Sequence, residues 1–266
     1  MWSRTAPTTA GFLLFAISNA TAQRDTLASS RSESRDRVSI VAGFADAQRR
    51  DVVVSPLTYL GSGYAASAAY DHFGARSAVA VVATWDAQSL RPQSNVNEST
   101  ERVMQGGLRA AALRTVADAY GWSFSAGATA GLWGMATEHR YPAPYDSRAG
   151  FFAAFAAAGP AAQARRPILG GLAQLEVDAP VFGFSNRAYS ETKTGQPLWN
   201  VQRVGPRELR ALDGALTYAP APLGRVGLLF SYRFSILDYR DAQPLRSASQ
   251  SFSIGLSRAF GAYRPR

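Results

Sequence analysis

The chain has 266 residues, no cysteine and a formal net charge of +9, carried by 28 basic and 19 acidic side chains. Without cysteine it can form neither disulfide bonds nor thiolate metal sites, so the fold must be stable without covalent cross-links. The basic residues are scattered rather than gathered into runs interleaved with aromatics, which argues against nucleic-acid binding and favours contact with anionic lipid headgroups.

The first 22 residues have the order of a secretory signal peptide. Arg4 is followed by an apolar run over residues 11–17 and by the small-residue triplet Ala20-Thr21-Ala22. This run is shorter than the roughly 20 residues that span a membrane as a helix, so we predict cleavage after Ala22 rather than a membrane anchor. Residues 23–36 are expected to form a flexible N-terminal segment.

Alternation of apolar with small or polar residues recurs along the rest of the chain, and this period of two is typical of strands with one apolar face. In residues 226–239, for example, Phe230 shares a face with other large apolar residues and Ser231 lies on the opposite face. The alternation predicts an all-β fold with ten strands, within a range of eight to twelve. They lie near residues 37–47, 59–73, 76–88, 101–117, 121–138, 148–158, 168–184, 207–219, 224–239 and 247–260. The segment 101–117 also fits a helix, and we predict a strand there.

The connections between these strands alternate between long and short. In a meander that closes on itself, alternate connections lie at opposite ends, which gives the barrel a loop end and a turn end. Short periplasmic turns and longer external loops are the pattern of bacterial outer-membrane barrels.

Together with the signal peptide and a last strand that contains Gly255 and ends at Phe260, the pattern resembles a bacterial outer-membrane β-barrel protein. The last strand departs from the usual signal at Arg258 and is followed by the tail 261–266. The resemblance implies a closed antiparallel up-and-down transmembrane β-barrel over residues 37–260, placed in the outer membrane of a Gram-negative bacterium. It also implies two partners, the outer-membrane lipid and the barrel-insertion machinery. A secreted soluble barrel or sandwich is the alternative.

Aromatic residues are expected in belts at the two ends of such a barrel. Trp122, Tyr218 and Phe260 fall near the turn end, and Trp85 and Tyr239 near the loop end.

The sequence offers little catalytic chemistry. Its two histidines, His72 at a predicted turn and His139 at the start of a predicted long loop, lie at opposite ends of the barrel and cannot share a site. No nucleophile elbow, zinc-protease motif, phosphate-binding loop or calcium loop is present, so we expect neither a cofactor nor a metal. The favoured interpretation of His139 is a solvated loop residue. The catalytic alternative is a rim hydrolase of lipid or peptide that uses His139 with Glu138 or Asp146.

Charged and polar residues also fall on the predicted inner face. They are Gln174, Glu176, Asp178, Asp213 and Arg233. Barrels of about eight strands are filled by their side chains, and open pores need about 16. We therefore favour a network of ion pairs that braces the lumen, with a narrow solute channel as the alternative.

The longest predicted loop, residues 185–206, contains Tyr189, Lys193 and Trp199 and is the expected contact surface for a surface or envelope protein partner. The sequence thus predicts a non-catalytic outer-membrane barrel that acts through its external loops in envelope structure, surface contact or as an accessory, with the rim hydrolase and the narrow channel as alternatives.

Overall fold

A computed structural model describes residues 35–52, 55, 57–74, 76–93, 99–141, 148–190, 201–221, 226–240 and 244–260. The predicted signal peptide, residues 23–34 and the tail 261–266 lie outside this part of the chain. The strands are β1 (Arg35–Asp51), β2 (Tyr59–Phe73), β3 (Ser77–Pro92), β4 (Thr100–Ala119), β5 (Trp122–Arg140), β6 (Arg148–Ile168), β7 (Gly171–Asp178), β8 (Phe182–Ser190), β9 (Val201–Val204), β10 (Leu209–Ala219), β11 (Val226–Tyr239) and β12 (Leu245–Phe260).

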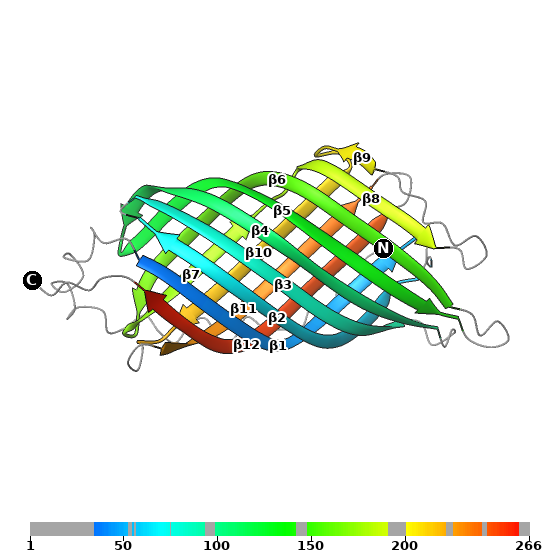
Figure 1. Ribbon diagram of the computed structural model, residues 1–266, viewed down its shortest axis with the longest axis horizontal. Helices are drawn as coiled ribbons and strands as arrows, with labels where there is room; N and C mark the ends of the chain where they lie inside the picture. The colour runs from blue at the N-terminus through cyan, green and yellow to red at the C-terminus, as the bar shows by residue number, and fades with distance from the viewer. Residues whose placement is uncertain are drawn as a thin grey trace, which may run out of the picture. The chain divides into compact units, whose positions relative to one another are not determined.

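These segments form a closed antiparallel barrel with ten strand positions (Figure 1). β7 and β8 both pair with β6 and share one position, interrupted at residues 179–181. β9 pairs with β8 and β10 pairs with β7, so they share the next position. The barrel closes where β1 pairs with β12, from Asp36 opposite Phe260 to Asp51 opposite Leu245. Apart from β9, which pairs only with β8 among the described residues, each strand has a neighbour on both sides, so the sheet closes on itself.

The predicted barrel of about ten strands is confirmed, and the segment 101–117, which also fitted a helix, lies within strand β4. The predicted loop 185–206 was wrong at both ends. Residues 185–190 belong to β8 and residues 201–204 form β9, because backbone pairing with β6 and between these two strands continues beyond the predicted strand end.

Two of the turn-end connections have only two residues. Tyr120 and Gly121 join β4 to β5, and Leu169 and Gly170 join β6 to β7, and all four residues have positive φ angles between 50° and 79°. Positive φ at both central positions defines the hairpin turn whose twist matches that of paired strands, and glycine adopts it without a steric penalty. These turns fix the register of their hairpins.

The outer face carries an apolar band that is bounded by arginines. Large apolar side chains are exposed all around it, among them Ile40, Phe44, Tyr64, Trp85, Leu132, Phe184, Leu228, Phe252 and Leu256. On β4 the band lies between two outward residues, Arg102 near the loop end and Arg114 near the turn end. These are twelve residues apart, a height of about 28–32 Å for a strand that rises about 3.3 Å per residue and tilts 35–45°. This height matches the apolar band of about 25 Å in membrane barrels.

Within the described residues there is no helix long and apolar enough to cross a membrane.

The expected aromatic belts are only partly present. Phe260 and Trp85 are exposed on the outer face, whereas Tyr239 is 3% exposed and packs in the lumen. Alternation along β11 places Tyr239 on the same face as Ser231, which is also buried, so assigning it to the outer belt was wrong.

Candidate functional site

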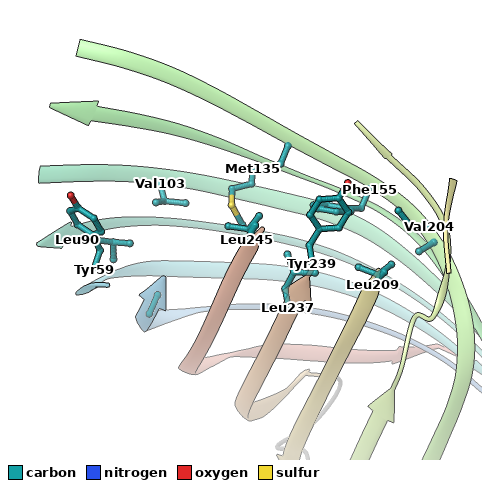
Figure 2. Packing of buried hydrophobic residues seen from close by; sticks show 13 residues of the cluster. Tyr59, Leu90, Val103, Met135, Phe155, Val204, Leu209, Leu237, Tyr239 and Leu245 are labelled. Atoms are coloured by element: carbon teal, nitrogen blue, oxygen red, sulfur yellow. The ribbon is translucent and has the colours of Figure 1, made fainter. Parts of the chain in front are cut away.

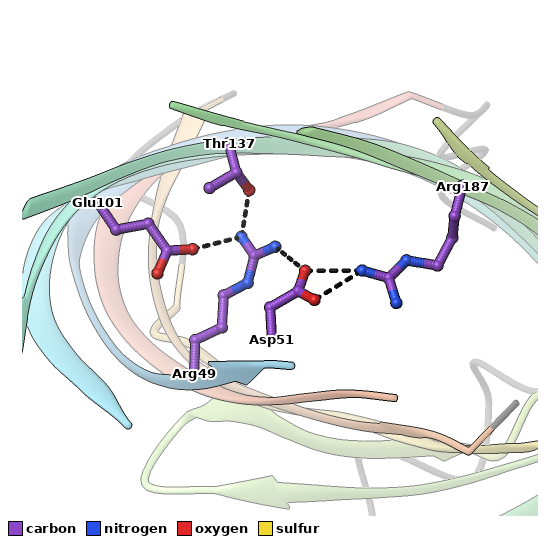
Figure 3. Close-up of polar contacts among 5 residues, drawn as sticks. All are labelled: Arg49, Asp51, Glu101, Thr137 and Arg187. Carbon is purple, nitrogen blue, oxygen red and sulfur yellow. Dashed lines mark hydrogen bonds and ion pairs between the residues drawn. The ribbon is translucent and has the colours of Figure 1, made fainter. Parts of the chain in front are cut away.

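The loop end of the lumen is crossed by a buried network of charged side chains (Figure 3). Arg49 on β1 lies at its centre: its guanidinium donates to Thr137 on β5 and pairs with Glu101 on β4 at 3.2 Å. It also pairs with Asp51 at 3.1 Å, and Arg187 on β8 donates to both oxygens of that carboxylate at 2.7 and 2.8 Å. The network thus connects β1 with walls on both sides of the barrel, and its two arginines balance its two acids.

An apolar cluster lies at the same end of the lumen (Figure 2). Its members Ala47 and Val103 are each two residues from a network residue, Arg49 and Glu101. Leu90, Leu209 and Leu245 are fully buried, and the rings of Phe155 on β6 and Tyr239 on β11 lie edge to face at 5.6 Å. Figure 2 shows Leu245 of β12 next to Met135 of β5, and Tyr239 of β11 next to Phe155 of β6. Because apolar side chains from different walls meet here, they narrow the lumen at this level.

A second polar layer lies in the middle of the barrel. Arg109 on β4 pairs with Glu176 at 2.7 Å and with Asp178, both on β7. Asp213 accepts a hydrogen bond from Ser235 and lies within electrostatic range of Arg109 and Arg233. A cavity of about 170 Å³ lies at this level. Its lining includes Arg109, Asp178, Asp213, Arg233, Asp86 with its partner Gln105, and serines of β12.

A third polar layer lies at the turn end of the lumen. Arg37 on β1 donates to Asp71 on β2 at 2.9 Å and reaches Gln174 on β7 at 3.3 Å. The guanidinium of Arg165 on β6 lies over the ring of Phe73 on β2, 4.6 Å from its centre. The structure therefore places all five predicted lumen residues on the inner face, and it connects Gln174, Glu176 and Asp178 to arginines of other strands.

The two histidines have different surroundings from those expected. His139 is not a solvated loop residue: it lies in β5, is 1% exposed, and contacts the rings of Tyr59 and Tyr141. Strand β5 extends two residues beyond the predicted end, to Arg140, which turns this side chain into the lumen. His72 lies within β2 rather than at a turn, and its Nδ1 is 2.8 Å from Asp36 on β1.

The acids proposed as partners of His139 do not join it. Glu138 precedes it in the same strand and points outward, where it pairs with Arg148 at 3.2 Å. Asp146 lies outside the described residues. The residue opposite His139 on the neighbouring strand is instead Glu101, which is also buried and faces the lumen.

The predicted partner-contact residues fall mainly outside the described part of the chain. This holds for Lys193 and Trp199, and for the side chain of Tyr189, whose backbone belongs to β8. Among the described residues, no group of three or more histidine and acidic side chains could hold a metal ion.

The sequence prediction missed the loop-end network. Arg49 and Asp51 follow the predicted end of the first strand at residue 47, and Arg187 lay in a predicted loop. The signal that could have found them is the continued alternation of the strand, which places Ala47, Arg49 and Asp51 on one face.

No family model matches the chain, and no curated protein matches it. Among solved structures it resembles the outer-membrane protease OmpT from Escherichia coli, with a TM-score of 0.53 and 6% sequence identity over 87% of this chain and 98% of that one. The translocator domain of the autotransporter NalP from Neisseria meningitidis has a TM-score of 0.48, 10% identity and coverage of 86% and 89%. At such identities the likeness concerns the fold alone. The chain therefore has the fold of the bacterial outer-membrane β-barrels.

Proposed function

We propose that this protein is a closed barrel of the Gram-negative outer membrane that has a non-catalytic role at the cell surface, contacting an envelope or surface protein through the loop end. The observation that carries the proposal is the lumen. Ion pairs cross it at two levels, a hydrogen bond from Arg37 to Gln174 crosses it at a third, and apolar side chains pack in it at the loop end. Such an interior supports a scaffold better than a conduit, because a channel needs a wetted path from end to end.

The outer face supports the membrane location. Leu108, Phe44 and Ile40 are between 52% and 71% exposed, and they belong to a band that runs around the whole barrel. Monomeric soluble proteins rarely expose apolar patches above a few hundred Å², so a continuous band is a surface for lipid. A closed barrel can enter lipid because its first and last strands pair, so the sheet closes on itself.

The orientation and the contact surface can be tested together through Lys193, which is the only lysine of the chain. A membrane-impermeant amine reagent added to intact cells should label the wild-type protein, and the variant Lys193→Arg should stay unlabelled. An amine-reactive cross-linker should then couple the partner to wild-type protein alone. Labelling that requires broken cells would contradict the external placement of residues 191–200.

The closed lumen can be tested by electrical recording. Purified protein that is refolded into a planar bilayer should show no discrete conductance steps, because the loop-end cluster and network block the lumen. Folding is checked by migration on a gel, where a folded barrel runs faster before boiling than after. Regular conductance steps from folded wild-type protein would overturn the scaffold in favour of the narrow channel.

One observation favours a second candidate, the rim hydrolase. His139 and Glu101 are paired in register with both side chains in the lumen, and Tyr59, in contact with His139, shares a 2.9 Å hydrogen bond with Ser99. A positioned acid or base contributes about 10²–10⁴-fold in rate. If the wild-type protein cleaves phospholipid or peptide and folded His139→Ala does not, the scaffold proposal fails. We expect no cleavage above the blank.

A further inference from the structure

Four arginines gather on the outer face at the loop end, around a single acid. Arg210, Asp238, Arg246 and Arg50 lie side by side on β10, β11, β12 and β1, each paired in register with the next. Arg240 lies two residues after Asp238 and pairs with it at 2.5 Å, and Arg246 pairs with Asp238 at 3.1 Å. We call Arg50, Arg210, Arg240 and Arg246 the arginine row.

Within the described part of the chain, acidic side chains do not balance the charges of this row. Asp238 supplies one negative charge for four positive ones, and the structure gives neither Arg50 nor Arg210 an acidic partner among the described residues. Arg50 and Arg246 are directly opposite on adjacent strands, an arrangement of like charges that destabilises a sheet. A fold that keeps such a pair on its surface gains stability when an anion lies between the two guanidinium groups.

The row also lies at a defined height. Two residues further along β10, β11 and β12, the outward side chains are Leu212, Ile236 and Ala248, which belong to the apolar band. On β1 the exposed residues Gln48 and Asp46 lie between Arg50 and Phe44, the first large apolar side chain of the band on that strand. The row therefore lies at the border of the hydrocarbon region. The headgroups of the surrounding leaflet lie at this border. Guanidinium groups bind phosphate oxygens in a bidentate way, and each basic residue near an anionic membrane surface strengthens the attraction.

We propose that the arginine row binds the phosphate headgroup of an anionic membrane lipid in the leaflet that the loop end faces. The proposal rests on the membrane location proposed above. The lipid chains would lie along the apolar band beneath the row while the phosphate bridges Arg50 and Arg246, which converts a repulsive pair into a joint site.

The test measures lipid preference by electron spin resonance. Wild-type protein is refolded into phosphatidylcholine vesicles that contain either spin-labelled phosphatidylglycerol or spin-labelled phosphatidylcholine, and the two association constants are compared. The wild type should prefer phosphatidylglycerol, and Arg50→Gln or Arg246→Gln should lower the preference by up to about fivefold each. Asp238→Asn should raise it, because the row loses its one competing acid. Added salt should weaken it.

The matched control is Arg114→Gln, which removes an exposed arginine from the outer face at the turn end. An equal loss in this variant, or no change in the row variants, would overturn the proposal while leaving the membrane barrel intact. If inorganic phosphate stabilises the protein in pure phosphatidylcholine vesicles as much as phosphatidylglycerol does, the ligand is soluble phosphate and the lipid assignment fails. Wild-type protein that folds but does not enter vesicles would refute the proposed membrane location itself.

Discussion

The depth of a charge within the outer band gives the sharpest test of the membrane assignment. Leu108 and Met104 both point outward from β4 and are similarly exposed, at 52% and 57%. Leu108 lies six residues from each of the bounding arginines, Arg102 and Arg114, which is about 14–16 Å of height from either rim. Met104 lies two residues from Arg102, or about 5 Å. The two sites therefore differ in depth but not in exposure.

Arginine at Leu108 should lower the free energy of unfolding by about 2–4 kcal/mol, whereas arginine at Met104 should cost about 0–1 kcal/mol, because its side chain can extend to the rim. If the outer face met water instead of lipid, the two equally exposed sites would respond alike, and each arginine would change the free energy of unfolding by no more than about 0.5 kcal/mol. The assay is guanidinium unfolding in phosphatidylcholine vesicles, followed by tryptophan fluorescence. Equal costs at the two sites, or a larger cost at Met104, would refute the reasoning.

Two further predictions concern the interior and the outer wall. Asp51→Asn should lower the free energy of unfolding by about 3–5 kcal/mol in the same assay, because it leaves two buried arginines without their shared carboxylate. Adding Arg187→Met to this variant should recover part of the lost stability. Strictly additive effects of the two substitutions would contradict the network. A methyl group at Gly214 would lie 2.3 Å from the Phe234 ring, so Gly214→Ala should cost at least about 1 kcal/mol. Gly150→Ala, where nothing lies within 4 Å, should change stability by less than about 1 kcal/mol, and similar effects at both glycines would argue against the ring contact.

The strands could be predicted because a barrel wall has two different surroundings. The outer face lies in surroundings that favour large apolar side chains, and the inner face lines a narrow lumen. The alternation between large apolar residues and small or polar residues is therefore strong in strands such as β11 and β12. Where the alternation weakens, the prediction was wrong. Residues 185–190 and 201–204 lack a regular alternation of large apolar residues in the sequence, and only backbone pairing shows them to be strands.

The partners across the lumen could not be predicted from the sequence. Alternation shows that Arg109 and Glu176 face inward, but their contact depends on the stagger between strands that are not neighbours. The same holds for Arg49 and Glu101. His139 shows a different difficulty, because one additional residue of strand decides whether a side chain is in solvent or in the lumen.

The seam between β1 and β12 has a consequence for the order of folding. Asp36 pairs with Phe260, so the contacts that close the barrel join the two ends of the described chain and have the largest sequence separation in the fold. Contacts between distant segments form slowly, since the intervening chain must first lose its conformational freedom. Until β12 is in place, β1 and β11 each present an open hydrogen-bonding edge. The period before closure is therefore when this protein is most exposed to pairing with another chain.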